Sequence, residues 1–103
     1  MSATATIAKA MSERELLQNV LDCARLYGWM CYHTFDSRRS EPGFPDIILT
    51  RRLRLLAIEC KRESGVLTTA QTAWLDALNE SGADTYVVRP SDWLSGRIEE
   101  VLR

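Results

Sequence analysis

The sequence predicts an α/β fold in which a central mixed sheet of four strands is flanked by helices. Three observations lead to it. A helix with a 3.6-residue apolar period is followed by three short apolar runs, giving the order α-β-β-β-α-β-α. The third strand, second helix and fourth strand form a right-handed crossover, which makes part of the sheet parallel. At 103 residues, the chain has room for one core. We expect a flexible N-terminal arm at 1–11 and one domain at 12–103.

The first helix has a clear start and end. Ser12 and Glu15 have capping-box spacing, in which the serine caps the helix and the glutamate returns to the cap. Gly28 is placed to stop the helix. Its predicted inward stripe consists of Leu16, Leu17, Val20, Leu21, Ala24 and Tyr27.

Three strands are expected next, at 29–35, 46–50 and 55–61. Residues 36–45 form a polar loop with two prolines and a glycine, and residues 51–54 form a turn that lacks an Asn-Gly signal. The run 55–61 is nearly all apolar, which predicts a central strand that is covered on both faces.

A second helix is predicted from Thr68, which has Gln71 at capping-box spacing, to a stop at Gly82. Residues 85–88 then form the fourth strand. Pro90 opens an additional C-terminal helix whose apolar residues are Trp93, Leu94, Ile98, Val101 and Leu102.

Acidic residues and a lysine mark the second and third strands. Asp46 opens one strand, and Glu59 and Lys61 lie near the end of the next. Side chains at i and i+2 share a face of a strand, so Glu59 and Lys61 project together and Cys60 points away. If the strands pair as a hairpin, Asp46 reaches the same patch. Two carboxylates beside an ammonium form a site for a hard divalent cation and a positioned water.

Each of these acids also has a purely structural interpretation. Asp46 could be an exposed carboxylate after a proline turn. Glu59 could form a buried ion pair with Lys61. We favour the metal site because an acid in the most apolar strand is costly to bury without a cation.

The element order and these residues resemble the PD-(D/E)xK nuclease superfamily, with its αβββαβ restriction-endonuclease-like core, and within it a stand-alone VRR-NUC domain of the phage type. The resemblance covers about 12–95. The residues that carry it are Glu15, Gly43-Phe44-Pro45-Asp46, Glu59-Cys60-Lys61 and Leu67-Thr68-Thr69-Ala70-Gln71.

The resemblance implies specific roles for these residues. Asp46, Glu59 and the backbone carbonyl of Cys60 would hold Mg²⁺ or Mn²⁺, with Glu15 as a further metal or catalytic candidate. Lys61 would orient the attacking water or stabilise charge in the transition state. Gln71 would position the water or a phosphate. For Glu15 and Gln71, helix capping is an equally good explanation.

Basic residues gather in one part of a chain whose net charge is −1. Seven of the 13 lysines and arginines fall at 38–62, together with three acids. A local basic patch can hold a phosphate backbone on an otherwise acidic protein. The DNA-contacting candidates are Arg38, Arg39, Arg51, Arg52 and Arg62.

Other classes of protein fit less well. Three cysteines without CxxC spacing argue against a disulfide framework, and with His33 they form no close ligand pairs for structural zinc. No apolar run approaches the roughly 20 residues of a membrane span, and there is no secretion signal. We expect a cytoplasmic protein, in the host cytoplasm if it is phage-encoded.

The resemblance implies a metal-dependent, structure-selective DNA endonuclease that resolves four-way (Holliday) junctions and also meets double-stranded DNA. Paired cuts imply a homodimer, with the last helix or the first helix as its interface. The alternatives are a less selective nicking or restriction-like nuclease, and a catalytically silent nucleic-acid-binding module on the same fold.

Overall fold

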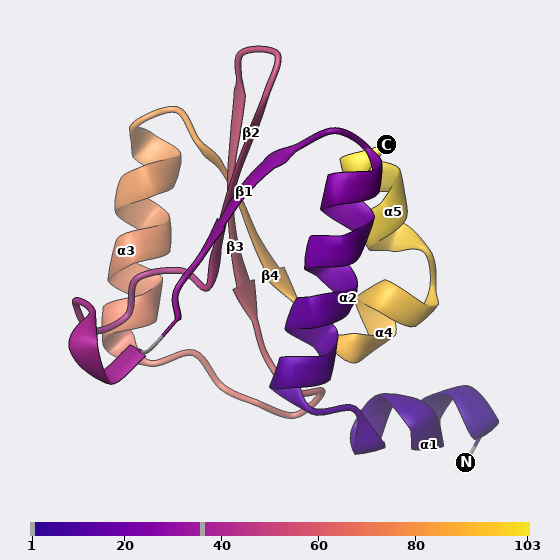
Figure 1. The fold of residues 1–103 in the computed structure, drawn as a ribbon. Coiled ribbons are helices and arrows are strands. Elements are labelled where there is room, and N and C mark those ends of the chain that lie inside the picture. The colour runs from indigo at the N-terminus through magenta and orange to yellow at the C-terminus, as the bar shows by residue number, and fades with distance from the viewer. Residues whose placement is uncertain (1, 36) are drawn as a thin grey trace.

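A four-stranded mixed sheet lies at the centre of the molecule, as the computed structural model shows for residues 2–35 and 37–103 (Figure 1). Asp36, the first residue of the predicted loop, lies outside the described residues. The strands are β1 (Met30–His33), β2 (Ile47–Arg51), β3 (Arg54–Cys60) and β4 (Asp84–Val88), and they lie in that order in the sheet. The first three pair antiparallel, whereas β3 and β4 pair parallel. This arrangement confirms the predicted fold class and the crossover.

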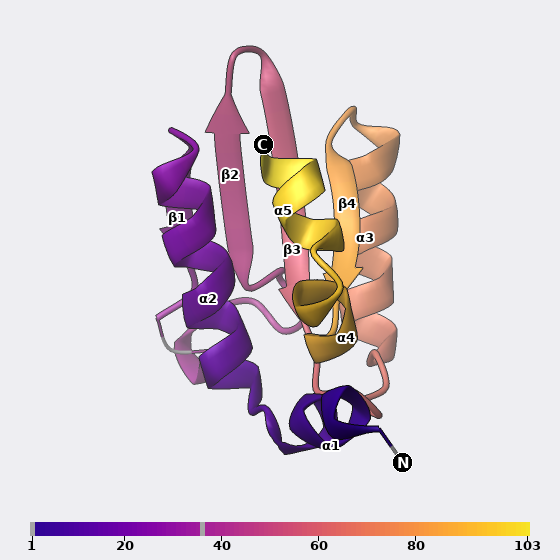
Figure 2. The ribbon, with the colours of Figure 1, turned by 90° about the vertical axis from the view of Figure 1, so that its right-hand side faces the viewer.

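Helices cover the two faces of the sheet unequally (Figures 1 and 2). On one face lie α2 (Glu13–Leu26), α4 (Pro90–Leu94) and α5 (Arg97–Leu102). On the other face lies α3 (Thr69–Glu80), which packs on β3 and β4. None of the helices that the structure describes has both the length and the apolar character needed to cross a bilayer.

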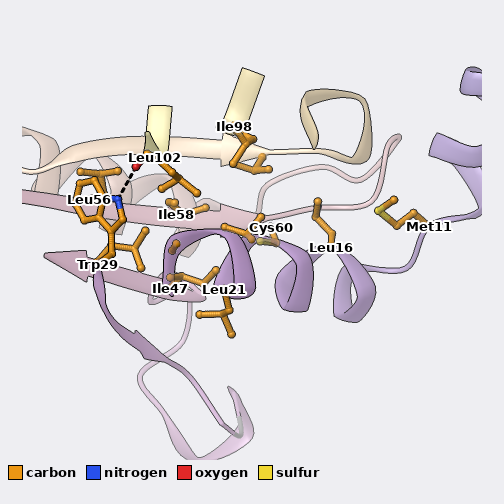
Figure 3. Close-up of a cluster of buried hydrophobic side chains, with 14 residues drawn as sticks. Met11, Leu16, Leu21, Trp29, Ile47, Leu56, Ile58, Cys60, Ile98 and Leu102 are labelled. Atoms are coloured by element: carbon orange, nitrogen blue, oxygen red, sulfur yellow. Dashed lines mark hydrogen bonds between the residues drawn. The ribbon is translucent and has the colours of Figure 1, made fainter. Parts of the chain in front are cut away.

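The main core fills the space between the sheet and the α2 side (Figure 3). Alternate residues of β3 point into it, and the whole run from Leu56 to Cys60 is buried, as expected for a central strand. Trp29 closes one end of this core and donates from Nε1 to the carbonyl of Leu102 at 2.8 Å. Glu59 lies on the opposite face of β3, which directs its carboxylate away from the main core.

Both predicted capping boxes are present. Ser12 Oγ accepts from the Glu15 backbone N–H at 3.1 Å, and a Glu15 carboxylate oxygen accepts from the Ser12 N–H at 3.3 Å. The same exchange links Thr68 and Gln71, at 3.1 and 2.9 Å. These motifs were predictable because each depends on residues only three positions apart.

The structure differs from the expectations at both ends of the chain. The segment expected to be a flexible arm contains α1 (Ala3–Ala10), which is capped by Ser2 and packs against α4 with Ala8 buried. The single helix expected after Pro90 is divided in two at Gly96, whose φ of 81° no helical residue adopts.

The turn between β2 and β3 has an unusual composition. Arg52 and Leu53 both have positive φ, 48° and 69°. Two consecutive left-handed residues are the geometry of a type I′ hairpin, for which Asn-Gly is preferred. The predicted turn is therefore present without its usual residues.

Candidate active site

A polar pocket of about 190 Å³ lies where β2 begins and β3 ends. The first turns of α2 and α3 reach the same place, together with the segment that leads into β2. Two strands and two helix starts thus converge on one hollow. Its lining residues are Glu13, Thr34, Ser40, Glu41, Gly43, Phe44, Asp46, Glu59 and Gln71.

Asp46 is held in place by backbone groups on both neighbouring strands. Its Oδ2 accepts from the Cys60 N–H at 2.8 Å. Its carbonyl accepts from the Thr34 N–H at 2.9 Å, just beyond β1. The carboxylate that opens β2 is therefore fixed beside the end of β3, as the hairpin pairing predicted.

The segment before Asp46 is pressed against α3. Gly43 has a φ of 86°, and a Cβ built on it would lie 2.5 Å from the Ala70 carbonyl carbon. One residue on, Phe44 packs edge-to-face on Trp74, with ring centroids 5.0 Å apart. This contact sets the position from which Asp46 enters the pocket.

Glu59 is buried, with 2% of its surface exposed. Its Oε2 accepts from Gln71 Nε2 at 3.2 Å, whereas Oε1 is buried and has no hydrogen-bond partner among the described residues. Burial raises the pKa of Glu59 to about 8, and the negative charge of the nearby Asp46 adds to the shift. The charge of Lys61 opposes it. A cation in the pocket would relieve both the burial cost and the repulsion.

Gln71 has the capping role that its spacing predicted, and it also contacts Glu59. Its Oε1 caps α3 through the Thr68 N–H, while its Nε2 reaches Glu59. Lys61 follows β3 directly and stays in register, since its N–H donates to the Val88 carbonyl at 2.9 Å. The structure thus brings Asp46, Glu59 and Gln71 together in the pocket. Lys61 does not line the pocket, although its charge acts on Glu59.

Cys60 points into the core, as its position between Glu59 and Lys61 predicted, and it is 1% exposed. Burial raises the pKa of its thiol, which is a structural rather than a reactive environment. Its backbone reaches the pocket side, where the Cys60 N–H donates to Asp46 Oδ2.

On α2, the structure places Glu13 rather than Glu15 at the pocket. Residues two apart on a helix point about 200° apart, so only one of the two can face the site. Glu15 returns to the Ser12 N–H. Sequence reasoning chose Glu15 from the family resemblance, with capping as the alternative explanation, and missed Glu13. The structure shows the capping contact for Glu15.

The described residues hold no cluster of three or more His, Cys, Asp or Glu side chains arranged around a metal. The donor set still fits a hard ion, because Mg²⁺ is commonly held by one or two carboxylates while water and substrate phosphates complete its shell. Asp46 and Glu59, with its unpaired Oε1, supply that pair.

The predicted DNA-contacting arginines divide between two ends of the molecule. Arg38 and Arg39 lie in the short 3₁₀ helix Ser37–Arg39 on the way to the pocket, and both are exposed. Arg62 follows Lys61 and lines a second hollow of about 350 Å³ with Lys9 of α1, a basic residue that sequence reasoning did not select.

Arg51 and Arg52 lie at the other end of the β2–β3 hairpin. The Arg51 guanidinium lies 4.3 Å over the Trp29 ring. It donates to the carbonyls of Tyr27 at 2.8 Å and Leu102 at 3.2 Å, and so closes the C-terminal ends of α2 and α5. This geometry gives Arg51 a packing role instead of the expected phosphate contact.

Comparison with known proteins agrees with this architecture. The family model of the VRR-NUC domain matches residues 4–92. No curated protein and no solved structure matched the chain. The family match covers most of the chain, including every element from α2 to β4 and the pocket between them, and the protein therefore belongs to the VRR-NUC family of nuclease domains.

Proposed function

We propose that this protein is a Mg²⁺- or Mn²⁺-dependent DNA endonuclease that selects branched structures and resolves four-way junctions. One observation carries the proposal. Asp46 and Glu59, from two different strands, share one pocket in which a buried carboxylate oxygen has no hydrogen-bond partner among the described residues. Nuclease activity follows from the family, and this geometry supports the choice of metal-assisted hydrolysis.

The ion would be held by Asp46, Glu59 and the carbonyl of Cys60, with Glu13 as the further carboxylate that the pocket offers. An all-oxygen donor set favours Mg²⁺ or Mn²⁺ over softer metals. The bound ion supplies Lewis-acid polarisation of the phosphate and a more acidic water. The Cys60 N–H fixes the orientation of Asp46 before any ion binds.

The remaining site residues act on the water and the phosphate. Lys61 places a positive charge beside Glu59, where it would stabilise the developing negative charge of the transition state or orient the water. Gln71 holds Glu59 through Nε2, and the same amide is within reach of a phosphate or water in the pocket.

The DNA backbone would approach over the basic residues on the pocket side. Arg38 and Arg39 precede the pocket in the chain, while Arg62 and Lys9 line the second hollow. Such contacts supply affinity without reading bases. This agrees with selection by branched shape rather than by sequence.

A four-way junction is two-fold symmetric, and its resolution needs two cuts on opposed strands. One chain offers one such pocket among its described residues. We therefore propose a homodimer, the form expected for a stand-alone phage-type enzyme in the host cytoplasm.

A cleavage assay on matched substrates tests the proposal. Labelled four-way, flap and linear DNA of the same sequence are incubated with Mg²⁺, Mn²⁺ or chelator, and cut strands are resolved. We expect paired incisions in the four-way junction, and a loss of most cleavage in Asp46→Asn. Equal rates on linear DNA would favour a nicking or restriction-like nuclease. No cleavage of any substrate, with binding retained, would favour a silent binding module.

Asp46→Asn removes a ligand charge with little change of shape, so its fold should persist. Glu41→Gln is a matched control, because Glu41 lines the same pocket yet is exposed. Near wild-type cleavage by Asp46→Asn would contradict the assignment of the site.

A further inference from the structure

Arg89 is a partly buried cation that has no role in the proposed mechanism so far. It follows β4 directly, and its φ of −116° and ψ of 162° keep the chain extended there. Its backbone N–H donates to Asp92 Oδ2 at 2.8 Å. Its guanidinium forms no hydrogen bond or ion pair with another described residue, and its Nη1 is buried without a partner. A buried polar group in this state is costly unless something outside the chain binds it.

The parallel pairing of β3 and β4 places Arg89 beside Lys61 (Figure 2). Cys60 pairs with Val88, so the next pair in this register is Lys61 with Arg89. The Lys61 N–H donates to the Val88 carbonyl at 2.9 Å, which carries the pairing past the end of β3. Adjacent strands of a sheet lie about 4.8 Å apart. The two basic residues are therefore direct neighbours at the end of the parallel pair.

Both basic residues start on the face of the sheet that carries the active site. Val88 is buried in the main core, on the α2 side, so Arg89 starts on the opposite side. By the same alternation Lys61 lies opposite Cys60, which is also in that core, and shares the face of Glu59. Arg89 therefore lies on this face as well, one strand away from the buried carboxylate of Glu59.

Two acids in the neighbouring segments are bound to other groups. Glu63 Oε1 accepts from the Ser91 N–H at 3.0 Å, and Asp92 Oδ1 lies 3.8 Å from Arg97 Nη1. Neither carboxylate forms an ion pair with the Arg89 guanidinium, so the described residues leave that charge uncompensated. Like charges at adjacent positions of two strands also repel each other. An anion bound between the two basic residues would remove both the repulsion and the cost of burial.

We propose that Arg89 binds a phosphate of the DNA strand within one nucleotide of the phosphate on which Lys61 acts. The inference rests on the proposed function, which places Lys61 at the reacting phosphate. Successive phosphates advance about 3.4 Å along one DNA strand, a step comparable to the spacing of about 4.8 Å between β3 and β4. A guanidinium suits this contact because its planar donors bind two phosphate oxygens at once. Such a contact adds affinity and fixes the position of the strand without reading a base.

Fluorescence anisotropy of the full chain with four-way DNA, in chelator and over a range of salt, tests the proposal. We expect Arg89→Met to bind about tenfold more weakly, the value of one charged hydrogen-bond contact. The slope of log K against log salt should fall by about one. Arg89→Lys keeps the charge and should keep the slope. Arg54→Met is the matched control and should bind normally, because Arg54 pairs with Asp84 at the opposite end of the same two strands.

Neutral methylphosphonate groups locate the contact on the DNA. One such group is placed at the mapped cleavage site or at either neighbouring position. At one of these three positions it should weaken binding by the wild type and leave binding by Arg89→Met unchanged. Equal sensitivity of both proteins at all three positions would overturn the inference.

Thermal unfolding without DNA distinguishes binding from a structural role. Arg89→Met should be at least as stable as the wild type, because it removes a buried guanidinium nitrogen that has no partner among the described residues. Arg89→Gln gives the same information if Arg89→Met fails to fold. A variant that loses stability but binds DNA with normal affinity and slope would make Arg89 structural and would overturn the inference.

The fate of the proposed function is read separately, because binding is measured without cleavage. A wild type that cuts no DNA, but whose salt slope depends on Arg89, would leave the phosphate contact standing and remove the nuclease proposal. Normal cleavage and normal binding by Arg89→Met would leave the nuclease standing and remove the contact.

Discussion

At the scale of single residues, the site is dominated by the burial of Glu59 beside Asp46. The carboxylate at the end of β3 is almost inaccessible, and one of its oxygens has no hydrogen-bond partner among the described residues. Folding therefore buries a carboxyl group whose ionised form water cannot stabilise, and the main charge nearby that favours ionisation is Lys61. In the proposed site, this cost in stability would leave the pocket ready to bind a cation.

The first prediction concerns pH and the stability of the metal-free protein. The pKa of Glu59 is raised from 4.5 to about 8, so the folded state holds a proton that the unfolded state releases. This contribution to the free energy of unfolding is fully present below pH 4.5 and is lost as pH rises to about 8. Glu59→Gln should remove this loss and stabilise the chelated protein at pH 8 by a few kcal/mol.

Urea unfolding at pH 5 and pH 8.5, in chelator and in Mg²⁺, measures this effect. Mg²⁺ should stabilise the wild type at pH 8.5 and leave Glu59→Gln nearly unchanged. Glu80→Gln, at the exposed end of α3, serves as the control. Parallel pH dependence of the wild type and Glu59→Gln would contradict the argument.

The second prediction separates Lys61 from its neighbour Arg62. Lys61→Ala should lower the single-turnover cleavage rate by roughly a hundredfold, because an electrostatic or proton-transfer role is worth about that much. The Mg²⁺ concentration that gives half of the maximal cleavage rate should change far less than the rate itself, when measured at pH 8.5, above the pKa of Glu59. Arg62→Ala should instead weaken DNA binding and keep the rate at saturating DNA. A Lys61→Ala enzyme with a normal rate and a weakened metal midpoint would make the lysine structural.

At the scale of elements, local signals predicted the structure well and distant contacts did not. The capping boxes at Ser12 and Thr68 fixed the starts of α2 and α3 because their partners are close in sequence. The pairing of Asp46 with the end of β3 was predictable from the alternation of strand residues. The position of α3 over β3 and β4 was not predictable from such local signals, because it depends on contacts between segments that are distant in the sequence.

At the type I′ turn of Arg52-Leu53, local residue preference disagrees with the observed backbone. Its residues disfavour positive φ by roughly 1–2 kcal/mol each, so local preference argues against the turn that the sheet imposes. Ladder pairing from Ile47 to Arg51 overrides that preference. The helix break at Gly96 was missed for a related reason, since glycine inside an apolar pattern is compatible with a continuous helix.

The third prediction concerns the segment that positions Asp46. Gly43→Ala adds a Cβ 2.5 Å from the Ala70 carbonyl carbon at a residue with φ of 86°. The strain should cost roughly 2–5 kcal/mol and push the segment away from α3, which displaces Asp46 and lowers cleavage. Gly28→Ala is the matched control, because its φ is 83° and its added Cβ meets nothing within 4 Å.

Thermal unfolding and cleavage rates of both variants separate backbone strain from the clash. Gly28→Ala should show the smaller loss of stability and normal cleavage under conditions in which it is folded. If both variants lose stability equally and Gly43→Ala cleaves normally, the contact with α3 does not position the site.

At the scale of the whole molecule, charge is distributed so that DNA can be bound by a chain with a net charge of −1. The basic run at 38–62 is divided by the fold. Arg51 closes helix ends at one end of the hairpin, whereas Arg38, Arg39 and Arg62 stay on the active-site side. Composition predicted the patch, but only the fold shows which of its arginines lie on the active-site side of the molecule.

The last prediction tests whether Arg38 and Arg39 lie on the DNA path. Replacing both with glutamine should weaken binding to four-way, flap and linear DNA by the same factor, because phosphate contacts carry no sequence or base information. The slope of log K against log salt should fall by about one for each lost contact. The control pair is Arg25 and Arg97, which are exposed on α2 and α5. Binding is measured by anisotropy in chelator, so that cleavage does not interfere. An unchanged slope would place both arginines off the DNA path, whereas a loss confined to four-way DNA would give them a role in recognising the junction itself.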